Sequence, residues 1–505
     1  MIVNTGQFPD VDEAQDFSYV LPSTPTSSHS PSKDYVYPVQ CFFTLPDPHS
    51  GLAMLSATPN FDLCKGSGLS TEQQTVISGS QITQIYNCRV IRGHALDFDE
   101  VWFQNGRIIN PALLYGLRGP DVRIDAQGLI VAPGLVDVQL NGAFGYDFSF
   151  NLDDIDKCLN AVSRGILLQG CTSFCPTVVS STSKTYHTVL PHIGRRPGSL
   201  RNGAESLGAH VEGPFMNPKK KGAHEQACLR AAPNGLADFD ECYGLDNLRE
   251  HVCYMTLAPE LDGVLGAIPN LINQCGIVVS QGHSAASHET ALQAHRSGAK
   301  MITHLFNAMT SFHHRDPGIV GLLGGAENNY STKHKPNNSL YDSDASLSSR
   351  AFYGLICDGI HVHSNAVKIA YNSHPAGAIL VTDAMGAMGL PDGQYKLGNM
   401  TVDVGPLADM KDNTRAAVIQ GTSTLAGSII TLIECVRKFK EFTQCSLVEA
   451  IEAATLHPAQ MLGIEHRKGT LEYGADADII FLTDDLQVER VFVRGELATP
   501  ETVGN

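Results

Sequence analysis

The stretch GIVVSQGHSAASHETALQAHRSGAKMITHLFN, residues 276–307, decides the fold. It begins and ends with the apolar runs GIVVSQGH and KMITHLFN, and a longer segment separates them. Runs that are apolar on both faces are typical of parallel strands buried in an α/β fold. Each run leads to a histidine, His283 or His304, for which a buried strand has no structural use. The stretch therefore predicts a strand–helix–strand unit with chemistry at its strand ends.

The same pattern recurs on both sides of this unit. The other runs are LIVAPGLVDVQ (129–139), SLGAHVEG (206–213), FYGLICDGIHV (352–362) and GAILVTDA (377–384). Because strand-like runs alternate with segments of helical period, we expect a (β/α)8 barrel over 133–463, with its site at the carboxyl-terminal face. Short β-type runs at 81–132 and 464–500 predict one small β-domain, built from segments before and after the barrel.

The last part of the barrel shows the clearest helical patterns. In IITLIECVRKFKEF, residues 429–442, apolar residues recur on one stripe, and Ser428 is a candidate N-cap. Ser446 and Glu449 form a capping-box pattern before a second helix.

Two segments lack the composition of a packed core. Residues 1–80 contain LPSTPTSSHSPS (21–32), which is rich in Ser, Pro and Thr, so we interpret them as a low-complexity, largely disordered extension. Residues 325–350 are polar, and we interpret them as an exposed loop inserted in the barrel.

The bulk composition narrows the class of protein. The chain has 505 residues, 43% of them apolar, which is enough for more than one domain and a large core. The net charge of −17 argues against nucleic acid or a membrane surface as partner. There are 13 cysteines without a disulfide rhythm and no apolar segment long enough to span a membrane. We therefore expect a reduced, cytoplasmic protein.

Three polar residues at the ends of apolar runs form the strongest candidate site. Glu212, His283 and His304 offer one carboxylate and two imidazoles, a donor set that suits a borderline divalent cation and leaves coordination positions open for catalysis. A single histidine of this kind would more often be a core residue whose hydrogen bonds are satisfied. Three metal-binding side chains at successive strand ends instead favour a metal site. Asp383 follows another run and is either a base beside a metal-bound water or a helix N-cap.

Other polar residues carry weaker signals. His361 and His363 could form a metal pair with Asp358, but we favour a substrate contact by His361, and we interpret His210 as a packing residue. His313, His314 and Arg315 form a basic cluster that is either a solvated loop or an anion site, since Arg binds phosphate oxygens in pairs.

Beyond these residues, the chain resembles a known family along roughly 81–500. The motifs, in order, are APGLVDVQLNG, HVEGPF, KKGAHE, GHSAA, THLFNAM, RDPGIVG, DGIHV, LVTDAMGAMG and TLAGS. Together they resemble the N-acetylglucosamine-6-phosphate deacetylases of the amidohydrolase superfamily. The resemblance implies a distorted (β/α)8 TIM barrel with a small β-sandwich built from both flanks.

The resemblance also implies roles for individual residues. The metal ligands would be Glu212, His283 and His304, and Asp383 would be the catalytic acid/base. The other implied catalytic group is His224, which would hold the acetyl carbonyl as it becomes an oxyanion. Substrate contacts are implied for Ala223, His224, Asn307, Ala308, Arg315, Asp358, His361, Leu425, Ala426 and Gly427. In particular, Asn307 and Ala308 would meet the phosphate, and Arg315 would reach the phosphate in the neighbouring subunit of a homodimer.

One departure from the superfamily pattern bears on the cofactor. Many members carry His-x-His after the first barrel strand, whereas this chain has Asp137-x-Gln139 followed by Asn141. Because Gln and Asn are poor ligands for a transition metal, we expect one divalent metal ion per subunit, with zinc as the best fit.

The expected reaction is deacetylation of N-acetylglucosamine 6-phosphate to glucosamine 6-phosphate and acetate, in amino-sugar catabolism. Two alternatives compete with it. One is an amidohydrolase acting on a cyclic amide or an N-acyl amino acid, but the chain lacks the His-x-His pair such enzymes often use. The other is a catalytically silent metabolite sensor, which the intact ligand set and Asp383 disfavour.

Overall fold

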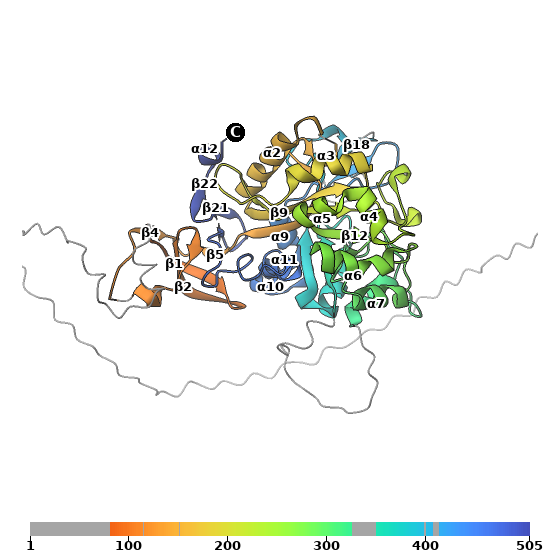
Figure 1. Ribbon diagram of the computed structural model, residues 1–505. Coiled ribbons are helices and arrows are strands. Elements are labelled where there is room, and N and C mark those ends of the chain that lie inside the picture. The colour runs from red at the N-terminus through yellow and green to blue at the C-terminus, as the bar shows by residue number, and fades with distance from the viewer. Residues whose placement is uncertain are drawn as a thin grey trace, which may run out of the picture. The chain divides into compact units, whose positions relative to one another are not determined.

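A computed structural model describes residues 81–504 except 115, 151, 326–349, 398–399 and 408–413. The predicted 1–80 extension and almost all of the 325–350 loop therefore lie outside the described residues. No helix in the part described is long and apolar enough to cross a membrane. The main element is a barrel of parallel strands (Figure 1). In spatial order these strands are β6 (Leu135–Leu140), β9 (Cys171–Val179), β11 (Ala209–Glu212), β12 (Val252–Leu257), β13 (Val278–Gln281), β14 (Met301–Ile302), β15 (Phe352–Ile356) and β16 (Ala378–Val381).

The barrel closes where its last strand returns to its first. The Asp383 backbone N–H donates to the Gln139 carbonyl oxygen at 2.8 Å, and Leu140 and Ala384 form a parallel bridge. The Thr382 hydroxyl donates to the Asp137 carboxylate at 2.6 Å, which fixes the two strand ends against each other. The predicted α/β barrel is therefore present, and its closure brings residues 137–141 beside 382–384.

Helices follow the strands and cover the outside of the barrel (Figure 1). They are α2 (Ile155–Leu168), α3 (Ser183–Ile193), α4 (Leu236–Tyr243), α5 (Leu245–His251), α6 (Val264–Cys275), α7 (His288–Arg296), α8 (Ser364–Ser373), α9 (Leu432–Thr443), α10 (Leu447–Glu452) and α11 (Leu456–Leu462). In α2, buried residues recur at helical spacing at Cys158, Leu159, Val162 and Ile166, so one face of the helix packs on the strands.

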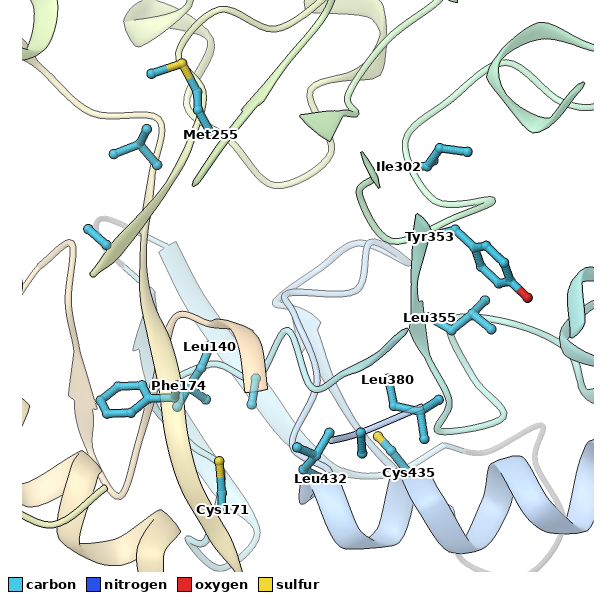
Figure 2. Close-up of a cluster of buried hydrophobic side chains, with 14 of the residues drawn as sticks. Leu140, Cys171, Phe174, Met255, Ile302, Tyr353, Leu355, Leu380, Leu432 and Cys435 are labelled. Atoms are coloured by element: carbon cyan, nitrogen blue, oxygen red, sulfur yellow. The ribbon is translucent and has the colours of Figure 1, made fainter. Parts of the chain in front are cut away.

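Strand residues alternate between two cores. Along β16, Ile379 and Val381 belong to the cluster that fills the barrel interior, while Leu380 belongs to the larger cluster between strands and helices. Figure 2 shows part of this outer cluster, in which Leu380 lies near Cys435 of α9. Burial on both faces explains why the barrel strands read as continuous apolar runs.

A second sheet joins the flanks of the barrel. Its order is β22-β21-β20-β5-β1-β2-β3, with β4 paired to β1, and β5 pairs antiparallel with β20. Figure 1 shows the orange strands β1 to β5 beside the blue strands β21 and β22. The strands are β1 (Thr83–Arg92), β2 (Ala95–Gln104), β3 (Arg107–Ile108), β4 (Val122–Asp125), β5 (Ile130–Pro133), β20 (Ile479–Leu482), β21 (Val488–Val493) and β22 (Glu496–Ala498). The residue limits predicted for the barrel (133–463) and for the two parts of the small β-domain (81–132 and 464–500) remain predictions.

The structure differs from the sequence analysis in three respects. Helix α9 begins at Leu432 rather than Ile429, and Thr431 with Glu434 forms its capping box. Ser428 is not the cap because it is hydrogen-bonded to the residues after β16. Its backbone N–H donates to the Asp383 carbonyl oxygen, and its hydroxyl donates to the Thr382 carbonyl oxygen. The capping box of Ser446 and Glu449 is confirmed.

The other two differences are additions. Barrel strands β9 and β12 were absent from the predicted runs. A separate antiparallel sheet, not predicted at all, lies between β16 and α9 and consists of β17 (Gly393–Leu397), β18 (Met400–Pro406) and β19 (Arg415–Ile419). We call it the β17–β19 sheet.

Candidate active site

A cavity of about 880 Å³ opens at the carboxyl-terminal ends of the barrel strands. Glu212 ends β11, and His283, His304 and Asp383 each stand two residues beyond the end of β13, β14 and β16. All four line the cavity. The structure thus brings together four residues that are widely separated in the sequence, at the face where barrel sites form.

The three candidate metal ligands converge on one point. Glu212 Oε1 lies 3.3 Å from His283 Nε2 and 3.1 Å from His304 Nε2, and the two Nε2 atoms are 2.9 Å apart. All three side chains are buried. Burial acts to raise the pKa of the Glu212 carboxyl, but its close contacts with the two imidazoles hold that pKa well below its usual range. The carboxylate is therefore ionised at neutral pH.

This donor set fits a divalent cation. The His283 Nδ1–H donates to the Lys220 carbonyl oxygen at 2.8 Å, so its Nε2 presents a lone pair to the centre. A backbone carbonyl that fixes the tautomer in this way is a recurring partner of metal-binding histidines. Burial lowers the pKa of His283, which favours the neutral ring that a metal requires. One carboxylate and two imidazoles leave positions open for water and substrate.

Asp383 lies in contact with Asn141 rather than with the three ligands. Asn141 Nδ2 donates to Asp383 Oδ1 at 2.7 Å. Burial, followed by the nearby negative charge of Glu212, raises the pKa of Asp383 to about 7. A carboxyl group with this pKa takes up and releases a proton near neutral pH, which suits a general acid/base. No helix follows directly for it to cap, because residues 384–392 lead into the β17–β19 sheet.

Gln139 and Asn141 contact the site directly. Gln139 Nε2 donates to Glu212 Oε1 at 2.9 Å, while Asn141 holds Asp383. The sequence analysis considered these two residues only as poor ligands. The structure shows that their amide N–H groups orient the two carboxylates of the site. Strand alternation places positions 137, 139 and 141 on one face but does not show which groups they meet.

His224 is also buried at the cavity wall. Its Nδ1 accepts the Ser180 backbone N–H at 3.1 Å, so the ring proton of the neutral imidazole must lie on Nε2. Burial lowers the pKa of His224 to about 3, which keeps the ring neutral. The geometry therefore makes Nε2–H a hydrogen-bond donor of fixed tautomer.

The backbone at the candidate residues adopts an uncommon conformation. The φ angles are 47° at His283, 29° at His304 and 46° at Asp383, all in the left-handed region. Non-glycine residues reach this region only at an energetic cost, and such strain gathers at functional sites.

Most of the remaining predicted residues also line the cavity. They are Ala223, Asn307, Ala308, His361, Leu425, Ala426 and Gly427. Asp358 is not in the cavity wall: its carboxylate accepts the His361 ring N–H at 2.6 Å and so lies behind that histidine. Arg315 is exposed and does not line the cavity.

The other histidines are placed as follows. His363 caps α8 by accepting the Asn365 N–H at 3.1 Å. His210 is buried beneath the site, stacked on Tyr254 with ring centroids 3.8 Å apart. Neither lines the cavity.

Part of the cavity wall was not predicted. Leu397, Met400 and Ile419 reach the cavity from the β17–β19 sheet, and their half-exposed strands gave no strong pattern in the sequence. Lys221 is the only lysine or arginine among the described residues that line the cavity.

Comparison with known proteins agrees with this geometry. Residues 130–498 match the model of the amidohydrolase family. A Danio rerio N-acetylglucosamine-6-phosphate deacetylase is 46% identical over 83% of this chain and 97% of its own length. The Mus musculus enzyme of the same name is 46% identical over 83% of this chain and 96% of its own.

A solved structure gives the same result at lower identity. The crystal structure of N-acetylglucosamine-6-phosphate deacetylase from Pasteurella multocida has a TM-score of 0.67 and 26% identity, and the match covers 83% of this chain and 100% of that one. The chain therefore belongs to the amidohydrolase family of metal-dependent hydrolases, in the branch of the N-acetylglucosamine-6-phosphate deacetylases.

Proposed function

We propose that the enzyme hydrolyses N-acetylglucosamine 6-phosphate to glucosamine 6-phosphate and acetate, as a step of amino-sugar catabolism. The observation that carries this proposal is the convergence of Glu212, His283 and His304 beside an Asp383 whose pKa lies near neutrality. The names of its relatives support the choice of substrate.

Glu212, His283 and His304 would hold one divalent cation per subunit, and zinc suits their one-carboxylate, two-imidazole set. Such a cation would polarise the acetyl carbonyl and lower the pKa of a water molecule. Gln139 would keep the Glu212 carboxylate turned toward the two rings by its hydrogen bond to Oε1.

The protein's own groups would move the proton. Asp383 in its ionised form takes a proton from the attacking water, whose oxygen forms the new bond to the acetyl carbon. His224 donates its Nε2–H to the developing oxyanion, as its fixed tautomer allows. Asp383 then gives the proton to the amide nitrogen as the C–N bond breaks, which yields a neutral amine and acetic acid, and the acid ionises to acetate in water.

The sugar phosphate would lie across the rest of the cavity wall. Asn307 and Ala308 would meet the phosphate, His361 the sugar, and Ala223 and residues 425–427 the remaining surface. The hydrogen bond from His361 to Asp358 would orient that ring.

A single lysine in the described cavity wall gives little positive charge for a phosphate dianion. We therefore propose a homodimer in which the exposed Arg315 of each subunit reaches the partner's phosphate site. We also propose a cytoplasmic location, which the absence of disulfides among the described cysteines supports.

Acetate release from a substrate panel tests the reaction. The expected result is rapid release from N-acetylglucosamine 6-phosphate, with a much lower kcat/KM for unphosphorylated N-acetylglucosamine and for the galactosamine epimer. Equal kcat/KM with and without the phosphate would exclude the proposed substrate.

Mixed dimers test the role of Arg315. Arg315→Ala and Asp383→Asn dimers should each be nearly inactive, but random mixing of subunits should restore about a quarter of wild-type activity, because half of the dimers gain one complete site. No recovery on mixing, with mixed dimers present, would show that Arg315 does not act across the interface.

A further inference from the structure

Strand β12 stands between the strands that lead to Glu212 and His283, yet it supplies no candidate ligand. Three residues beyond its end lies Glu260, a half-buried carboxylate that the mechanism does not use. Glu260 Oε1 accepts the Ala285 backbone N–H at 2.6 Å, and Oε2 accepts the Ser284 hydroxyl at 2.6 Å. The carboxylate thus binds the two residues that directly follow His283.

Glu260 holds a second segment as well. Asn217 Nδ2 donates to Glu260 Oε1 at 2.9 Å, and the Asn217 backbone N–H donates to the His283 carbonyl oxygen at 2.9 Å. Asn217 begins the short 3-10 turn Pro218–Lys220, where its side chain accepts the Lys219 N–H. The carbonyl of Lys220 at the end of this turn is the group that accepts the His283 Nδ1–H.

These contacts fix His283 from two directions. The loop after it is bound to one carboxylate, and the carbonyl that sets its tautomer stands on a turn bound to the same carboxylate. The backbone of His283 needs such support because its φ of 47° is unfavourable for a residue with a side chain.

We infer that Glu260 is a positioning residue of the metal centre: by binding Asn217, Ser284 and Ala285 together, it aims the Nε2 lone pair of His283 at the cation. This inference rests on the proposed function, because it requires that His283 is a ligand. Partners of this kind, one shell outside the ligands, tune metal affinity by about 10- to 100-fold.

Glu260→Gln is a nearly isosteric test. The neutral amide loses the charge that strengthens all three hydrogen bonds, and its NH2 group can keep the Ser284 contact only if the hydroxyl turns from donor to acceptor. The matched control is Glu434→Gln at the start of α9, because Glu434 likewise accepts one backbone N–H and one hydroxyl, both from Thr431. Glu434 does not line the cavity.

The measurement is Zn²⁺ affinity by competition with a chromophoric chelator, without substrate, together with the melting temperature of the metal-free protein. Glu260→Gln should weaken Zn²⁺ binding about 10- to 100-fold. Glu434→Gln should leave the Zn²⁺ affinity unchanged, and it should change the melting temperature of the metal-free protein little because glutamine can also complete the capping box. Ser284→Ala, which removes a single donor, should weaken Zn²⁺ binding by a smaller factor.

Wild-type Zn²⁺ affinity in Glu260→Gln would overturn the inference while leaving the proposed reaction intact. If Glu260→Gln fails to fold, Ser284→Ala decides: weaker binding supports the inference and unchanged binding overturns it. If the wild-type protein itself binds no Zn²⁺ and releases no acetate, the result contradicts the proposed function. The inferred role of Glu260 is then contradicted as well, because it depends on that function.

Discussion

Two clusters of buried charge in this molecule differ in how their charges are balanced. One is the candidate active site, and the other joins the barrel to the small sheet and centres on Lys468. Lys468 Nζ lies 2.8 Å from Glu205, 3.0 Å from Asp476 and 2.5 Å from Asp478, and Arg467 pairs with Glu205 and Asp476. We call this second group the Lys468 network.

The pKa values express the difference. Burial works against ionisation in both clusters, but Arg467 and Lys468 hold the pKa of Glu205 below its usual range, and three carboxylates raise that of Lys468. At the active site the nearby histidines and the Asn141 hydrogen bond do not offset burial and the negative charge of Glu212, which raise the pKa of Asp383 to about 7. A cluster whose charges are already compensated stabilises the fold, whereas one left uncompensated retains the capacity to bind a cation or move a proton.

The sharpest test of this contrast is Asp383→Asn. Asparagine keeps the shape and the acceptor for Asn141 but cannot take a proton, so kcat should fall by about 10²- to 10⁴-fold. Steady-state kinetics measure the loss, and Zn²⁺ content should match the wild type because the three ligands are untouched. Near-normal turnover in a fully folded variant would remove Asp383 from the mechanism.

The Lys468 network should respond in stability rather than in rate. Lys468→Met leaves three buried carboxylates with one cation fewer, and breaking a buried ion pair costs about 3–5 kcal/mol. Urea unfolding measures the change, and the variant that remains folded should keep its kcat. A cost below ~1 kcal/mol would show that the network is not the structural element described here.

The raised pKa of Asp383 predicts a pH-dependent stability in the metal-free protein. Because this pKa is about 7 when folded and 3.8 in the reference state, the unfolded chain loses its proton first, and stability falls as pH rises from about 4 to 7. Metal-free Asp383→Asn should therefore be more stable than metal-free wild type at pH 8, by on the order of 1–4 kcal/mol.

That excess stability should shrink towards zero near pH 4, where Asp383 is protonated in both states. Urea unfolding at a series of pH values in the presence of a chelator measures it. A variant that is less stable than wild type at pH 8 would contradict the raised pKa.

The smallest effect is expected at the exposed edge of the Lys468 network. Arg107 Nη1 lies 2.9 Å from Asp476, but the arginine side chain is 45% exposed. Arg107→Ala should cost at most ~1 kcal/mol in the same urea measurement, because solvent screens an exposed pair. A cost close to that of Lys468→Met would mean that burial is not what separates the two positions.

Much of the fold could be predicted because parallel strands buried on both faces read as apolar runs. The predicted runs were recognised by polar residues at their ends, such as Glu212 and Asp383. Strands β9 and β12 were missed because no such residue ends them, and with β12 the sequence analysis also passed over Glu260, which acts through a loop beyond the strand. The β17–β19 sheet was missed because its strands are partly exposed and do not read as apolar runs.

The candidate site could be predicted as a set of residues but not as a set of contacts. Residue types and strand ends pointed to Glu212, His283, His304 and Asp383. Nothing local in the sequence shows that Gln139 reaches Glu212, since that contact depends on how two strands are aligned in the closed barrel.

Closure of the barrel at β6 and β16 has a consequence for the chain during its synthesis on the ribosome. The three metal-binding candidates have emerged once residue 304 has left the exit tunnel, but β6 cannot meet its closing neighbour until β16 and Asp383 follow. A nascent chain paused between these points would expose the edge of β6 to other proteins. Asp383 and the strand that closes the barrel thus become available in the same step of translation.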